Sequence, residues 1–185
     1  MGRSSNIWTR FFSSAIVLSL LVGGFFSGCR DTEQETNAER GETEKPIVVA
    51  TTTMLTDLAE QIGGDDVSVE GIVQPGADPH IYQPRPSDAR LISRSDLVIM
   101  NGLHLEGWME RLIKNAGGQR PVLKASERVE PINASDSPGG VDPHFWFELD
   151  GWKVAAENVA RSMKELFPEG VDARKRIQNR LEAYR

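Results

Sequence analysis

Cysteine is nearly absent from this chain. Cys29 is the single cysteine among 185 residues, so no disulfide bond can form within the chain and a disulfide-stapled small fold is excluded. Disorder of the whole chain is also excluded, because 39% of the residues are hydrophobic and can bury apolar surface. A hydrophobic core must therefore hold the fold together, and the length suits one ordinary domain.

Basic residues are scarce relative to acidic ones. The chain carries 21 Lys and Arg against 27 Asp and Glu, which gives a formal net charge of −6. A surface that neutralises phosphate groups needs an excess of positive charge. The sequence therefore predicts no nucleic-acid partner.

The first 28 residues have the layout of a secretory signal peptide. Arg3 and Arg10 precede an uncharged run, residues 11–28, which is rich in Phe, Leu, Val and Ile and ends in small residues. This run is short for a membrane span and is interrupted by Gly23 and Gly24. We therefore expect residues 1–28 to direct the chain out of the cytoplasm.

Cys29 stands directly after this leader. The four residues Phe26–Cys29 resemble a bacterial lipobox, in which the cysteine is lipidated and becomes the mature N-terminus. Residues 29–45 are almost wholly polar, which is typical of a flexible tether. The lipobox resemblance implies an extracytoplasmic protein attached to the membrane through Cys29. Plain secretion and a retained anchor are the alternatives.

Residues 46–168 alternate short β-branched runs with amphipathic segments. The pattern predicts strands over residues 47–50, 67–73, 96–100 and 121–125. It predicts helices over residues 54–62, 87–93, 105–116 and 150–167, with Ser87 capping the second helix. Residues 126–141 are polar and turn-rich. This alternation predicts an α/β fold with a parallel four-stranded sheet flanked by helices.

A further helix is predicted over residues 171–185. Its apolar positions, Ile177, Leu181 and Tyr184, share one face, and no residue that ends helices follows them. A terminal helix that frays and a longer helix of which this is the first part are both consistent with the pattern.

Two of the three histidines, His80 and His144, end the same tripeptide, Asp-Pro-His. Both tripeptides lie in predicted loops, and loops at the carboxyl ends of parallel strands are where α/β sheets bind ligands. Neutral imidazole is the commonest protein ligand of transition metals, and a preceding proline stiffens the loop. Asp78 and Asp142 are each placed to accept a ring N–H and so fix the tautomer. Two histidines do not complete a site, because Zn²⁺ takes four ligands and Mn²⁺ takes more.

Several segments together resemble one family along the whole predicted domain. They are Val48–Leu55, Asp57–Ala59, Ile62–Asp65, Pro75–Tyr82, Pro86–Ala89, Asp96–Val98, Asn101–Gly107 and Asp142–Trp146. In their order and spacing they resemble the N-terminal lobe of the metal-binding solute-binding proteins of ABC transporters, which take up zinc and manganese. The family includes adhesin-type lipoproteins of streptococci.

The resemblance implies roles for individual residues. His80 and His144 correspond to the two metal ligands that the N-terminal lobe supplies, and the other ligands come from a C-terminal lobe. Residues 169–185 correspond to the start of the long helix that joins the lobes. We therefore expect this sequence to contain residues 46–168 as the N-terminal lobe and to lack the C-terminal lobe.

His104 and Glu106 lie in the segment Asn101–Gly107 of the same resemblance. Family members often carry a histidine there without using it as a direct ligand, so we expect His104 to line the cleft or to bind metal weakly. We expect Glu106 to cap the following helix, with a weak or indirect metal contact as the alternative.

The function implied is an extracytoplasmic, monomeric receptor, not an enzyme, that captures Zn²⁺ or Mn²⁺ and delivers it to the membrane permease of an ABC importer. Three alternatives stay open: a zinc-dependent hydrolase, a surface adhesin and an inactive truncated remnant. Against the hydrolase, the sequence contains neither HExxH nor GxSxG. The choice between zinc, manganese and iron is not decided by these residues.

Overall fold

The computed structural model of the chain describes residues 44–135 and 140–185. The predicted leader, the lipidation site at Cys29 and the tether up to residue 43 lie outside the described residues.

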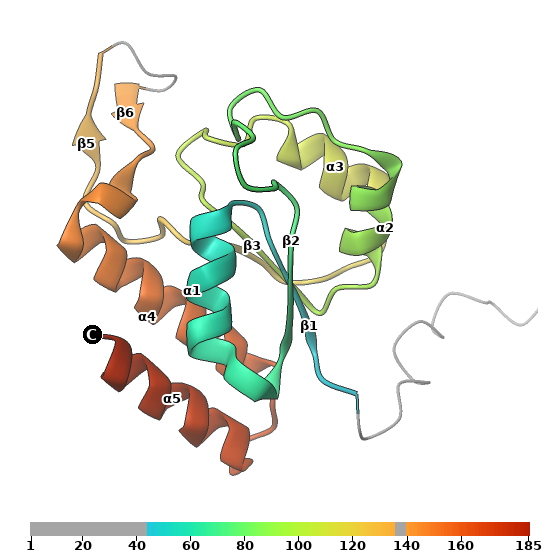
Figure 1. Cartoon of the computed structure of the whole chain (residues 1–185), viewed down its shortest axis with the longest axis vertical. Coiled ribbons are helices and arrows are strands. Elements are labelled where there is room, and N and C mark those ends of the chain that lie inside the picture. Colours follow the sequence, from blue (N-terminus) through green and yellow to red (C-terminus); the bar gives the residue numbers. More distant parts are fainter. Residues whose placement is uncertain (1–43, 136–139) are drawn as a thin grey trace, which may run out of the picture. The chain divides into compact units, whose positions relative to one another are not determined.

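Four strands form one sheet, as predicted (Figure 1). They are β1 (Ile47–Ala50), β2 (Ser68–Gly71), β3 (Leu97–Met100) and β4 (Val122–Lys124). All neighbouring pairs are parallel, and the order is β2-β1-β3-β4. The chain moves to one side of β1 to form β2 and to the other side to form β3. Ligands of open α/β sheets bind at the carboxyl ends of the strands where the order reverses in this way.

Helices cover both faces of the sheet (Figure 1). They are α1 (Thr53–Gly63), α2 (Pro86–Ser93), α3 (Met109–Ala116), α4 (Leu149–Glu165) and α5 (Asp172–Tyr184). Short 3₁₀ turns span Gly64–Asp66 and Phe145–Phe147. Helices α1 and α4 lie on one face with α5 packed beside them, and α2 and α3 lie on the other.

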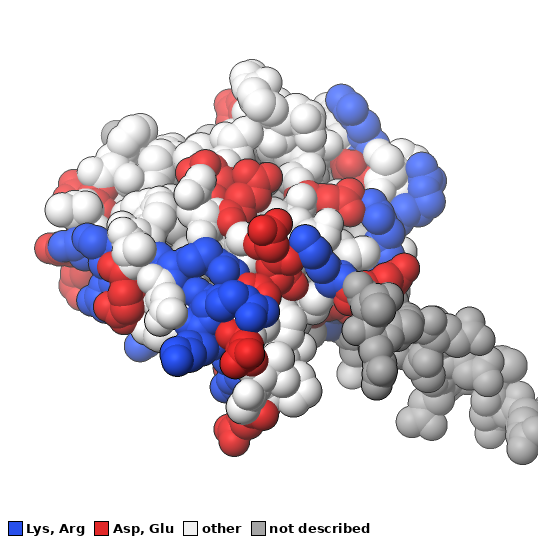
Figure 2. Space-filling view, turned by 60° about the horizontal axis from the view of Figure 1, so that its bottom comes forward, with Lys and Arg blue, Asp and Glu red and all other residues white. Residues whose placement is uncertain are grey.

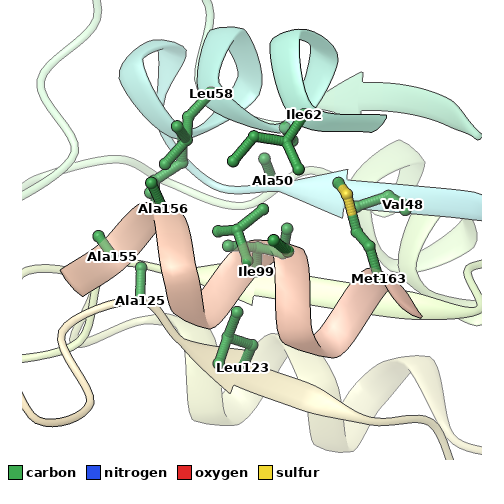
Figure 3. Packing of buried hydrophobic residues seen from close by; sticks show 14 of the residues in the cluster. Val48, Ala50, Leu58, Ile62, Ile99, Leu123, Ala125, Ala155, Ala156 and Met163 are labelled. Atoms are coloured by element: carbon green, nitrogen blue, oxygen red, sulfur yellow. The ribbon is translucent and has the colours of Figure 1, made fainter. Parts of the chain in front are cut away.

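The strands divide their side chains between two hydrophobic clusters because successive residues of a strand point to opposite faces. Val48 and Ile99 pack toward α1 and α4, whereas Val49 and Val98 pack toward α2 and α3. Figure 3 shows the first cluster, to which α4 contributes small residues such as Ala155 and Ala156. The two central strands, β1 and β3, are buried on both faces and have no polar alternation, which is why they are apolar throughout.

Helix ends follow local side-chain chemistry. Thr52 caps α1 by accepting the N–H of Leu55 at 3.3 Å, and α1 ends at the predicted Gly63. Ser87 does not cap α2, so that prediction is wrong. Asp88 does so instead: its carboxylate accepts the backbone N–H of Arg85 at 2.7 Å, just before the helix begins.

Two local predictions fail for physical reasons. Helix α3 begins at Met109 and not at residue 105, because residues 103–108 form a series of turns. The turns start with positive φ angles of 83°, 50° and 64° at Gly102, Leu103 and His104, which a right-handed helix does not contain. The turn-rich segment also contributes a small antiparallel pair, β5 (Ile132–Asn133) and β6 (Val141–Asp142). Strands of two residues are too short to leave a periodic pattern in the sequence.

Asp66 attaches the C-terminal helix α5 to the rest of the domain. Its side chain is only 9% exposed and accepts hydrogen bonds from Arg176 and Arg180. Arg180 also donates to the carbonyls of Ile62 and Gly63, the last carbonyls of α1. Figure 2 shows basic and acidic side chains interspersed over this end of the molecule.

Within the part of the chain that the structure describes, no helix combines the length and apolar character that a membrane crossing requires.

Candidate metal site

The two Asp-Pro-His loops meet in the structure. His80 lies in the loop between β2 and α2, and His144 lies between β6 and the turn at residues 145–147. The Nε2 atoms of the two rings are 3.2 Å apart, with ring centroids 5.3 Å apart and planes tilted by 52°. Two histidines that are 64 positions apart in the sequence therefore direct their Nε2 atoms toward the same point.

This separation suits two ligands of one metal ion. Zn–N bonds are about 2.0–2.1 Å long, so two nitrogens on a tetrahedral ion lie about 3.3–3.4 Å apart. His80 is exposed, and the His144 side chain is 38% exposed, so water or further ligands can reach the pair from the solvent side.

Asp142 orients the ring of His144. Its Oδ1 atom lies 2.5 Å from Nδ1 of that ring and also accepts the backbone N–H of His144 at 2.9 Å. These two hydrogen bonds hold the pKa of Asp142 below its usual value. A carboxylate at Nδ1 favours the tautomer with its proton there, which leaves the Nε2 lone pair directed at His80.

Asp78 acts on its loop differently. Its Oδ1 atom accepts the backbone N–H of His80 at 2.8 Å. Asp78 thus shapes the loop through the backbone, whereas Asp142 contacts both the backbone and the ring of its histidine.

Glu106 does not cap the following helix, and that prediction is wrong. The Glu106 side chain turns back toward the ends of β1 and β3, where its carboxylate accepts three hydrogen bonds. Thr51 Oγ1 donates at 2.5 Å, and the N–H groups of Asn101 and Gly102 donate at 2.7 and 3.2 Å. Burial raises the pKa of Glu106, although these donors oppose the shift. The residue is 3% exposed and braces the loop after β3.

His104 stands apart from the histidine pair. It is exposed and lies in the left-handed region, with a φ of 64°. In the described ranges, no three His, Cys, Asp or Glu side chains come together closely enough to hold a metal ion. Among the residues that the structure describes, neither His104 nor Glu106 joins the pair in such a group.

Two side chains beside the site were not assigned to it from the sequence. Trp108 Nε1 donates to the carbonyl of Pro79 at 2.8 Å, and Asn101 Nδ2 donates to the carbonyl of Pro143 at 3.0 Å. Trp108 is buried and only 5% exposed. Because both acceptors are backbone carbonyls far away in the sequence, no residue pattern could predict these two hydrogen bonds.

Residues 48–185 match the family model described as zinc-uptake complex component A, periplasmic. A metal ABC transporter substrate-binding lipoprotein of Streptococcus cristatus is 32% identical over 91% of this chain and 55% of its own length. The manganese-binding lipoprotein MntA of Bacillus subtilis is 34% identical over 68% of this chain and 42% of its own length. The chain spans about half the length of these relatives.

Solved structures agree with the sequence relatives. The periplasmic zinc-binding protein TroA of Treponema pallidum aligns with a TM-score of 0.68 and 31% identity, over 76% of this chain and 50% of TroA. A cadmium-bound periplasmic metal-binding protein of Candidatus Liberibacter asiaticus aligns with a TM-score of 0.69 and 28% identity, over 76% of this chain and 51% of its own.

Proposed function

The chain belongs to the family of the periplasmic component A of zinc-uptake complexes, and from this premise we propose that it captures a divalent transition-metal ion outside the cytoplasm for an ABC importer. The observation that carries the proposal is the convergence of His80 Nε2 and His144 Nε2 at 3.2 Å. Asp142 at Nδ1 of His144 favours a lone pair on the Nε2 atom of that ring, and the distance between the two Nε2 atoms suits two ligands of one metal ion.

The cargo is proposed to be Zn²⁺ or Mn²⁺. Relatives are named for manganese, zinc and iron. Imidazole alone does not choose among these metals, since the choice depends on the number and softness of the remaining ligands. His80 and His144 supply two ligands, and water or other protein groups complete the coordination.

The location and partner are also proposals. The relatives are named as lipoproteins of ABC transporters, which supports attachment of this chain to the membrane through Cys29, exposed on the extracytoplasmic side. The partner is then the membrane permease of the importer. We expect the chain to act as a monomer.

Metal titration tests the proposal. Zn²⁺ and Mn²⁺ are titrated into the wild-type chain, His80→Ala, His144→Ala and His104→Ala, with a chromogenic chelator as competitor. We expect binding in the wild type, because two oriented imidazoles face one point, and at least about tenfold weaker binding when either is removed. His104→Ala is the matched control and should bind like the wild type. Equal affinity in His80→Ala, His144→Ala and wild type would refute the histidine site.

The same preparations test the hydrolase alternative. A catalytic zinc site usually has three protein ligands and one open position, whereas the described residues bring two together. We expect no chelator-sensitive hydrolysis of ester or peptide substrates. Turnover that is lost with chelator and with His144→Ala would replace the transport proposal by an enzymatic one.

A further inference from the structure

One segment of the chain, residues 101–108, contacts both histidine loops. At its start, Asn101 Nδ2 donates to the carbonyl of Pro143 at 3.0 Å; at its end, Trp108 Nε1 donates to the carbonyl of Pro79 at 2.8 Å. Each accepting carbonyl belongs to the residue immediately before a histidine. The two loops are far apart in the sequence, and both are hydrogen-bonded to this one segment.

Each Pro–His peptide group is held from both sides. The carbonyl of Pro79 is bound by Trp108, and the N–H of the same peptide is bound by Asp78 at 2.8 Å. In the other loop the carbonyl of Pro143 is bound by Asn101, and the following N–H by Asp142 at 2.9 Å. Because a peptide group is planar, fixing both ends fixes the direction in which the chain enters the histidine.

The supporting segment is itself rigid. Asn101 and Trp108 are 1% and 5% exposed, so their donors do not exchange freely with water. Between them, the buried carboxylate of Glu106 binds Thr51 Oγ1 and two backbone N–H groups. The positive φ angles of residues 102–104 are sustained by these contacts. The segment thus holds its two donors at a fixed separation.

We propose that Asn101 and Trp108 are positioning residues that jointly set the spacing of His80 and His144 for metal capture. The inference rests on the proposed function. Neither residue contacts the metal: each acts through the carbonyl of a proline. Without one donor, the corresponding loop retains its aspartate bond but loses the bond on the opposite side of the peptide, and the ring samples other positions.

Matched substitutions elsewhere in the chain separate positioning from stability. Trp108→Phe keeps a ring and removes the donor, and its control is Trp152→Phe, whose Nε1 donates to Tyr184 Oη at 3.0 Å. Asn101→Ala removes a buried amide, and its control is Asn158→Ala. Asn158 is fully buried and donates to the carbonyls of Ala125 and Glu127 at 3.0 and 2.6 Å, neither of which belongs to a histidine loop.

We expect Trp108→Phe and Asn101→Ala to weaken Zn²⁺ binding by about tenfold or more, as removal of groups that orient metal ligands does. The two controls should stay within about twofold of the wild type, since neither side chain donates to a Pro–His peptide group. In addition, His144→Ala should reduce the Zn²⁺ affinity by a smaller factor in the Asn101→Ala background than in the Asn158→Ala background. The reason is that a mispositioned His144 ring already contributes less to binding.

Amide hydrogen exchange of the metal-free protein gives a second readout. The N–H of His144 should exchange faster in Asn101→Ala, and the N–H of His80 faster in Trp108→Phe, each by about tenfold or more relative to its control variant. A general loss of stability would instead accelerate exchange at all buried amides. Because no metal is present, this readout tests the positioning even if the chain binds no metal.

The outcomes separate the two proposals. If His80→Ala and His144→Ala bind like the wild type, the proposed function fails, and hydrogen exchange alone decides the positioning. If those variants lose binding while Asn101→Ala and Trp108→Phe match their controls in affinity, the positioning inference is overturned. Equal exchange at His80 and His144 in test and control variants overturns it as well.

Discussion

Asp78 and Asp142 occupy the same place in two identical tripeptides and make different bonds. Asp142 contacts the Nδ1 atom of the His144 ring as well as its backbone N–H, whereas Asp78 accepts the backbone N–H of His80. An amide oxygen can replace a carboxylate as acceptor of a backbone N–H. It cannot replace the negative charge that makes an adjacent imidazole a stronger ligand. The two aspartates should therefore respond differently to the same substitution.

Asp142→Asn should weaken Zn²⁺ binding by about tenfold or more, because the ring of His144 loses its charged partner. Asp78→Asn is the matched control and should change the affinity by less than about threefold, since its backbone bond survives. Competition titration against a chelator measures both. Equal losses in the two variants would contradict the distinction between a ring contact and a backbone contact.

Helix α5 is attached to the domain by apolar contacts and by charge. Ile177 and Leu181 are buried against the cluster formed with α1 and α4. Beside them, hydrogen bonds from Arg176, together with the charges of Arg176 and Arg180, hold the pKa of Asp66 below its ordinary value of 3.8. A carboxyl whose pKa is lowered by folding stabilises the fold when it is ionised. That contribution is present above the unfolded pKa and is lost as the pH falls through the folded value.

Asp66→Asn should lower the free energy of unfolding by about 1.5–3 kcal/mol at neutral pH, the range for hydrogen bonds to charged groups. The difference from wild type should shrink as the pH falls below 3.8, where the wild-type carboxyl also loses its charge. Urea unfolding at several pH values measures it. Asp65→Asn is the control: that side chain is fully exposed and lies 3.7 Å from Lys45, and surface pairs contribute little. A difference independent of pH would contradict the ionic origin.

At the scale of the whole molecule, the His80–His144 pair joins segments from the two faces of the sheet. The His144 loop is continuous with Phe145, which is buried in the cluster shared with α1 and α4. The His80 loop is held by Trp108, which is buried in the cluster shared with α2 and α3. An ion bound to both histidines therefore connects segments that pack on opposite sides.

Metal addition should stabilise the whole domain. If Zn²⁺ binds only the folded state, a free concentration of about 100 times Kd adds about 2.7 kcal/mol to the free energy of unfolding. Thermal unfolding followed by circular dichroism should then show a higher Tm with Zn²⁺, in one cooperative transition. At the same Zn²⁺ concentration, the shift should be clearly smaller in His80→Ala and His144→Ala. A Tm that does not depend on the metal in the wild type would contradict this expectation.

The sequence predicted those parts of the fold that depend on local patterns. The strands containing Val48 and Val98 are short apolar runs, which is the mark of parallel strands buried on both faces. The pairing of His80 with His144 was expected from the family resemblance. The support by Asn101 and Trp108 was not predicted, because a side-chain bond to a distant carbonyl depends on tertiary structure alone. The start of α3 was missed because amphipathic spacing continues through residues 105–108 while the backbone there is a series of turns.

The histidine pair is open to solvent on one side, which bears on how quickly an ion can leave it. His80 is exposed, and the side chain of His144 is 38% exposed. An incoming ligand can therefore bind an ion at this pair before either imidazole–metal bond breaks. Exchange by such stepwise substitution is faster than release from an enclosed cage, in which every bond must break first. If the pair holds an ion as proposed, the residence time of that ion should therefore depend on the ligands that approach it as much as on the strength of the two Nε2 bonds.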